Sequence, residues 1–208
     1  MIEYIREIDA TKWNGSQKNN IEQYKNVPGV WILLGKKKGD THLVCLQVGQ
    51  TKKDISSEIK TNIYYLCDNS SEHPAQKKYV NQFGEGKFDY DVPISRQEFL
   101  YKEIAKNYDN LTFICVAHGK ELENQDSLLR TIEKYVAFKT LCRYWANGGP
   151  YNEKAPEEVE RIKKECTDSC AELFEKIKKD YPEKKADFLK EFLDKLIDGE
   201  FDYLISEK

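Results

Sequence analysis

The chain has 208 residues, of which 39% are hydrophobic and 33% are charged, and its formal net charge at pH 7 is −3. This length suits one globular domain with an appendage, and thirteen Tyr and nine Phe supply apolar surface that a disordered chain lacks. No apolar run approaches the ~20 residues of a membrane span, and the first residues do not resemble a signal peptide. We therefore expect a folded cytoplasmic protein without membrane contact, whose six cysteines are reduced thiols.

Two short apolar runs, at 30–34 and 43–48, are rich in strand-forming residues. Residues 35–40 between them contain two glycines and three lysines. This layout predicts two antiparallel strands joined by a hairpin turn.

A helix is predicted next, because Thr51 or Asp54 can cap a segment that reaches roughly to Cys67. Its apolar residues recur at helical spacing and form one stripe: Ile55, Ile59, Ile63 and Leu66. Residues 68–94 are rich in Asn, Ser, Gly and Pro, which is typical of an irregular insertion.

Ser95 and Glu98 form a capping box that begins another helix, in which Phe99, Ile104 and Tyr108 are available for packing. The nearly continuous apolar run at 111–117 predicts a strand buried on both faces. Asp126 or Ser127 then opens a long helix that ends before Asn147. Its apolar face contains Leu128, Leu129, Ile132, Val136 and Leu141.

From Ala155 the pattern changes to two charged amphipathic helices, separated at Tyr181 and Pro182. The apolar stripe of the first helix contains Val159, Ile162, Cys166, Cys170, Leu173 and Ile177. The stripe of the second contains Phe188, Leu189, Phe192, Leu193 and Leu196. We interpret 155–208 as a helical cap that completes the core, with a partner-binding module as the alternative. Residues 201–205 are a candidate edge strand.

Gly29, Val30 and Trp31 in the first strand, with Gln47, Val48 and Gly49 in the second, resemble the two half-motifs of the GIY-YIG endonuclease superfamily. The predicted order of strand, strand, helix, insertion, strand and helix is also the order of that family's core. The resemblance implies an α+β fold, with a small, mainly antiparallel sheet flanked by helices. On this view 1–154 is the GIY-YIG-like core with an N-terminal extension, and the C-terminal helical pair is an addition.

The resemblance further implies a metal-dependent endonuclease that hydrolyses phosphodiester bonds in DNA, with Mg²⁺ or Mn²⁺ as its cofactor. Glu133, on the helix after the third strand, resembles the metal-binding glutamate, and Asn152 resembles the family's asparagine. A metal polarises the scissile phosphate and stabilises the leaving oxygen. We therefore expect Trp31, Gln47, Gly49 and Glu133 to converge on one concave surface.

Several positions depart from the family pattern. Trp31 and Gln47 stand where tyrosines are expected, and neither side chain can serve as an acid or base. The helix after Thr51 has no arginine, so Lys53 or Lys60 is the candidate cation there. Other candidates for the missing cation and phenol are His73, Lys77, Lys78, Arg96, Tyr64, Tyr65 and His118.

Lysines flank the two half-motifs, at Lys36, Lys37 and Lys38 and at Lys52 and Lys53, and they can attract nucleic-acid phosphates. Three functions therefore stay open. The first is a divergent metal-dependent endonuclease. The second is a degenerate nuclease fold that binds nucleic acid or protein, and the third is a helical interaction protein without nuclease ancestry. The sequence does not decide whether the chain forms a homo-oligomer.

Overall fold

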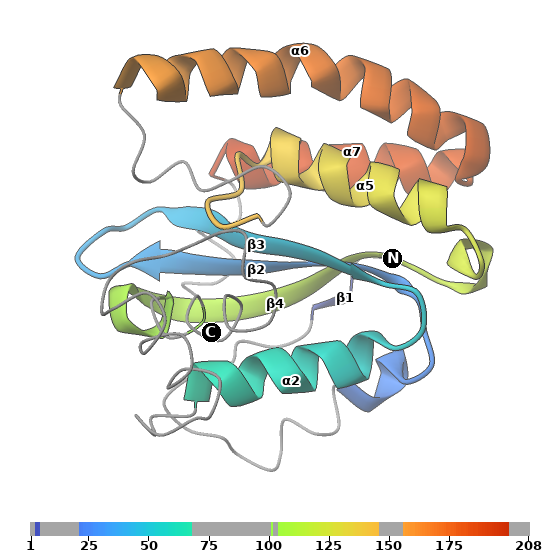
Figure 1. Cartoon of the computed structure of the whole chain (residues 1–208), viewed down its shortest axis with the longest axis horizontal. Helices are drawn as coiled ribbons and strands as arrows, with labels where there is room; N and C mark the ends of the chain where they lie inside the picture. Colours follow the sequence, from blue (N-terminus) through green and yellow to red (C-terminus); the bar gives the residue numbers. More distant parts are fainter. Residues whose placement is uncertain (1–2, 5–20, 68–100, 102–103, 146–155, 200–208) are drawn as a thin grey trace, which may run out of the picture.

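The computed structural model describes residues 3–4, 21–67, 101, 104–145 and 156–199, and it has an α+β fold (Figure 1). Its sheet contains β1 (Glu3–Tyr4), β2 (Gly29–Lys37), β3 (Leu43–Thr51) and β4 (Tyr108–His118). Its helices are α2 (Ile55–Cys67), α5 (Asp126–Lys139), α6 (Pro156–Asp180) and α7 (Glu183–Ile197), with short 3-10 turns at Glu22–Tyr24 and Lys120–Leu122. Among these described helices, none is both long and apolar enough to cross a membrane.

The strands lie in the order β1-β4-β2-β3, and each neighbouring pair is antiparallel. The predicted hairpin is confirmed, because β2 pairs with β3 from Gly29 opposite Thr51 to Lys36 opposite Leu43. The predicted buried strand is β4, in which residues 111–117 are all buried. Gly29 allows β2 to lie close to β4, since a Cβ at position 29 would lie 2.3 Å from the carbonyl oxygen of Ala117.

Helices cover both faces of the sheet (Figure 1). On one face, α2 packs Ile55, Ile59 and Ile63 against a cluster that includes Trp31 and Leu33. On the other face, α5 and α7 pack against Val30, Ile32 and Leu34, and α6 lies outermost against α5. Side chains alternate between the faces of a strand, so neighbouring residues of β2 belong to different clusters.

The C-terminal helices contribute to the same core as the sheet. Leu173 and Ile177 of α6 and Leu189 and Leu193 of α7 are buried in the cluster that contains Ile32. The helix break at Tyr181 and Pro182 lies where it was predicted. The expected burial of Phe188 is wrong, because its side chain is 43% exposed while Leu189 beside it faces the core.

Two predicted helix ends are also wrong. Tyr108 is not helical but begins β4, where it pairs with Lys37. Helix α5 ends at Lys139, several residues before the predicted end, and Leu141 adopts a left-handed conformation at φ 49°. The turn brings the next residues to the open edge of β3, where the Arg143 N–H donates to the carbonyl of Cys45 at 3.1 Å.

Candidate functional site

Trp31 and Gly49, the last residues of the two half-motifs, lie side by side on β2 and β3. The indole covers Gly49, since a Cβ at that glycine would lie 2.3 Å from Cζ2 of Trp31. Trp31 is only 1% exposed and also makes an edge-on contact with the ring of Phe113, at a centroid distance of 5.5 Å. The sheet surface above Gly49 is therefore filled by an indole ring.

Helix α2 presents Glu58 toward this ring. Burial raises the pKa of Glu58 to about 7, and repulsion from Glu133 adds to the rise. The indole N–H of Trp31 and the hydroxyl of Thr51 oppose it, because both favour the ionised carboxylate. The indole N–H of Trp31 is buried and lies near the Glu58 carboxyl. Among the described residues it has no partner at hydrogen-bond distance and angle.

Glu133 lies near the middle of α5 and is 9% exposed. Its Oε1 accepts a hydrogen bond of 3.1 Å from Nε1 of Trp145, in the segment that follows the helix. Burial raises the pKa of Glu133, while the Trp145 N–H and the charge of Arg130 lower it. Trp145 is held by an edge-on contact with Phe138, so this carboxylate already has a structural partner.

The expected convergence of Trp31, Gln47, Gly49 and Glu133 on one surface is wrong. Trp31 and Gly49 face α2, whereas Glu133 belongs to a helix on the opposite face of the sheet (Figure 1). The reason is that α5 buries its apolar stripe against the Val30 and Ile32 side. Repulsion from Glu133 contributes to the raised pKa of Glu58, although their helices cover different faces of the sheet.

Gln47 is 6% exposed and lies opposite Leu33 in the β2–β3 pairing. Its backbone carbonyl accepts a contact from the Cys45 thiol at 3.7 Å. Its side-chain Oε1 is buried and has no hydrogen-bond partner among the described residues. Gln47 thus adds an oxygen acceptor to this region but no ionisable group.

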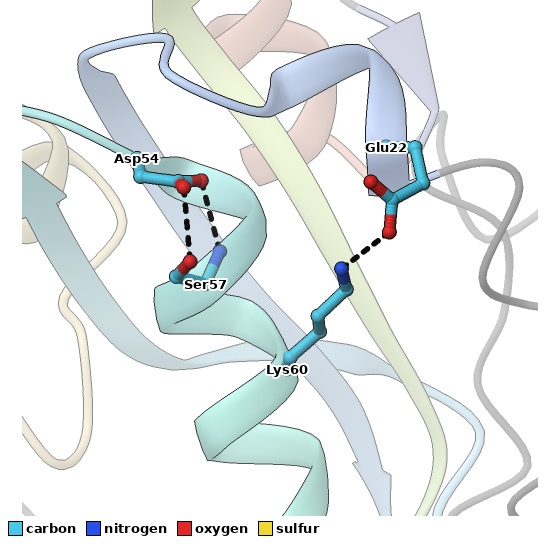
Figure 2. Close-up of polar contacts among 4 residues, drawn as sticks. All are labelled: Glu22, Asp54, Ser57 and Lys60. Atoms are coloured by element: carbon cyan, nitrogen blue, oxygen red, sulfur yellow. Dashed lines mark hydrogen bonds and ion pairs between the residues drawn. The ribbon is translucent and has the colours of Figure 1, made fainter.

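Lys60, a candidate for the missing cation, forms an ion pair with Glu22. Figure 2 shows its ammonium directed at Glu22, with Nζ 2.5 Å from Oε1. The same view shows how α2 begins: Asp54 accepts bonds from the Ser57 N–H at 3.0 Å and the Ser57 hydroxyl at 2.9 Å. Asp54 is therefore the helix cap.

The other predicted site residues are placed as follows. His118 makes an edge-on ring contact with Tyr24, and its carbonyl accepts a bond of 3.4 Å from Lys185. Lys52 forms an ion pair with Asp126, and Lys53 is exposed at the same end of β3. Asn152, His73, Lys77, Lys78 and Arg96 lie outside the described residues, as do the side chains of Tyr64 and Tyr65.

Two residues of this region were not predicted from the sequence. Glu58 follows Ile55 by three positions and precedes Ile59 by one, so helical spacing alone places it at the border of the buried stripe. Trp145 has no comparable signal, because it reaches Glu133 only after the chain turns along β3. Glu58 is the acid that α2 turns toward Trp31, on the helix for which the resemblance implies an arginine.

The described residues fit a Mg²⁺ or Mn²⁺ centre only in part. Both ions prefer carboxylate oxygens, and Glu133 and Glu58 are the acids near the half-motifs. Within the described ranges, no group of three or more His, Cys, Asp or Glu residues could hold a metal. Burial also raises the pKa of both carboxyls, which disfavours the ionised form that a cation needs.

Comparison with known proteins adds no relative. No protein-family model matches the chain, and neither a curated protein nor a solved structure matches it. The class defined by the fold is therefore an α+β protein with a small antiparallel sheet between helices.

Proposed function

We propose that the chain is a catalytically inactive, GIY-YIG-like module that binds nucleic acid. The observation that carries the proposal is the Trp31 indole on Gly49, with Glu58 beside it. A phosphodiester positioned over Gly49 would meet a filled surface and an acid. A nuclease of this type instead needs an open surface, a phenol or a water as nucleophile or base, and a guanidinium for the phosphate.

The cost of these replacements supports the absence of turnover. General acid–base assistance is typically worth ~10²–10⁴-fold in rate, and neither an indole nor an amide supplies it. Glu58 in its ionised form repels a phosphate, whereas an arginine would hold one with two parallel hydrogen bonds. The nearest described lysine on α2, Lys60, is engaged by Glu22.

A metal-dependent endonuclease acting on DNA is the second candidate, favoured by the buried position of the Glu133 carboxyl on α5. In that case Glu133 would hold Mg²⁺ or Mn²⁺ weakly until waters and substrate phosphates completed its shell. The bound metal would supply charge stabilisation at the phosphate. Trp145 would orient Glu133 through its 3.1 Å hydrogen bond.

A cleavage assay separates the two candidates. Supercoiled plasmid is incubated with excess protein and Mg²⁺ or Mn²⁺, using the wild type and Glu133→Gln, which keeps an oxygen acceptor for Trp145. The proposal predicts no nicking by either protein, together with a gel shift at low salt. Nicking by the wild type that Glu133→Gln abolishes would establish the enzyme instead.

Calorimetry with Mn²⁺ and an oligonucleotide tests the metal separately. The proposal predicts that the wild type and Glu133→Gln give the same heats, since no metal centre is formed. A metal-binding heat that the variant loses would assign Glu133 as a ligand. A chain that neither binds nor cleaves at low salt would leave a protein-interaction role, and the proposal would fail.

A further inference from the structure

Two cysteines that are far apart in the sequence meet at one edge of the sheet. Cys45 lies on β3, the last strand in the order β1-β4-β2-β3, and Cys142 lies in the turn that follows α5. Both belong to the buried cluster that contains Ile32, where Cys45 is 4% exposed and Cys142 is 0% exposed. The two thiols are in hydrogen-bond contact, so the strand edge holds a dithiol.

Hydrogen bonds between the turn and β3 fix the backbone on either side of this dithiol. The Arg143 N–H donates to the carbonyl of Cys45 at 3.1 Å, and the Tyr144 N–H donates to the carbonyl of Leu46 at 2.9 Å. In Figure 1 the chain descends from the end of α5 toward β3 to make these contacts. A disulfide needs neighbouring backbones and side chains that face each other, and this arrangement supplies both.

The turn is also the layer that covers the two sulfurs. Residues 140, 141, 143 and 144 are half-buried, whereas Cys142 between them faces inward. Burial raises the pKa of the Cys142 thiol, and the Cys45 thiol beside it adds to the rise, so Cys142 stays protonated while the turn is closed. The thiolate is the reactive form of cysteine, so reaction requires the turn to open locally.

The backbone of the turn favours such an opening. Leu141 adopts a left-handed conformation at φ 49°, which is strained for a residue other than glycine. Opening releases this strain and breaks the two bonds to β3, while the strand keeps Cys45 in place through its pairing with β2. Cys45 is therefore the thiol that meets an oxidant first.

The other described cysteines are arranged differently. Cys115 faces the α2 side of the sheet, and its thiol contacts the carbonyl of Ala117 on its own strand, 3.8 Å away. Cys166 and Cys170 lie four residues apart on α6, where side chains point the same way along the helix rather than toward each other. Among the cysteines that the structure describes, Cys45 and Cys142 thus form the pair arranged for a bond.

We propose that Cys45 and Cys142 form a reversible disulfide when the protein meets hydrogen peroxide. The Cys45 thiolate attacks one peroxide oxygen, the O–O bond breaks, and the other oxygen leaves as water after taking up a proton. The sulfenic acid on Cys45 is then attacked by the Cys142 sulfur, which forms the S–S bond and releases the hydroxyl as a second water. Two thiols are oxidised and one peroxide is reduced, and an external thiol reverses the change.

The bond has a structural consequence that can be measured. It closes a loop of about 100 residues and holds the turn on β3, and it should raise the Tm by about 4–16 °C at this chain length. Trp145, the hydrogen-bond partner of Glu133, follows in the same turn and is restrained with it. This inference does not depend on nucleic-acid binding.

The test exposes folded wild-type protein to hydrogen peroxide, blocks the remaining thiols with N-ethylmaleimide in denaturant, and measures the intact mass. The expected product has lost the mass of two hydrogen atoms and carries two fewer maleimides than the reduced chain. A non-reducing digest should contain a linked peptide pair with Cys45 and Cys142. A phosphine reductant should restore all six thiols and the original Tm.

Two alanine variants locate the bond. Cys142→Ala should give no cross-link and should leave a sulfenic acid on Cys45 that dimedone captures. Cys115→Ala is the matched control, because it removes an equally buried thiol from the other face of the sheet and should cross-link as the wild type does. The wild-type digest needs no variant, so the test stands even if Cys142→Ala fails to fold.

Other results would overturn the proposal. Six blocked thiols after peroxide treatment of the folded protein would show that the dithiol does not react. Oxidation confined to other cysteines, such as Cys170, would assign the reaction elsewhere. A bond between Cys45 and Cys142 that forms only in urea, or that lowers the Tm, would show that the native turn does not present the pair.

Discussion

Replacing Gly49 by alanine tests the packing that closes the half-motif surface. The new Cβ would lie 2.3, 2.6 and 3.0 Å from Cζ2, Cε2 and Cη2 of Trp31, whereas ordinary contacts begin at 3.4 Å. The ring cannot retreat easily, because Phe113 contacts it and α2 packs on the same face. Overpacking of this kind costs about 1–3 kcal/mol, offset by about 0.4–1 kcal/mol from the lower entropy of the unfolded alanine chain.

We therefore expect Gly49→Ala to lower the free energy of unfolding by about 1–2 kcal/mol. At this chain length that corresponds to a fall in Tm of about 2–8 °C in calorimetry or thermal circular dichroism. Trp31→Phe removes the ring atoms that clash, so in that background Gly49→Ala should be nearly neutral. If alanine costs the same with either ring, the indole does not cover Gly49, and the explanation of the closed surface fails.

Three further predictions concern acids of the core and the helix cap. Asp54→Ala should lower the free energy of unfolding by about 1 kcal/mol, while Asp54→Asn keeps the cap. Burial alone would raise the pKa of Asp54, but the Ser57 hydrogen bonds hold it below its ordinary value. Urea titrations should therefore show the wild-type advantage above pH ~4 and its loss at lower pH. The pKa of Glu58 is raised to about 7, so its contribution to the free energy of unfolding is full below pH ~4.5 and is lost as pH rises through 7. Glu58→Gln should flatten the dependence of unfolding free energy on pH, and an unchanged dependence would contradict the buried acid. Glu133→Ala should cost about 1–3 kcal/mol more than Glu133→Gln in urea unfolding, because it leaves the Trp145 N–H buried and unpaired; equal costs would show that this bond contributes nothing.

The helices and strands were largely predictable because their signals are local. The apolar stripe of α2 and the break between α6 and α7 follow from spacing and from Pro182. The exposure of Phe188 was not predictable, since Phe188 and Leu189 are adjacent and only the docked helix decides which one faces the core.

The candidate site was less predictable, because it depends on which sheet face each helix covers. Periodicity shows that α5 has an apolar stripe, but it does not show that this stripe packs on the face opposite Trp31. Ion pairs between residues that are distant in sequence are equally unpredictable. Lys60 and Glu22 are 38 residues apart and Lys52 and Asp126 are 74 apart, and no sequence pattern connects either pair.

The most direct test of the central claim measures binding and cleavage in one reaction. Wild-type protein, a labelled 20-base-pair duplex and Mn²⁺ are mixed at 50 mM salt, the bound fraction is read by anisotropy, and the same sample is then resolved on a denaturing gel. An inactive nucleic-acid-binding module predicts a saturable bound fraction and only full-length strands. Shortened strands that accumulate with time, or no bound fraction at any protein concentration, would contradict it.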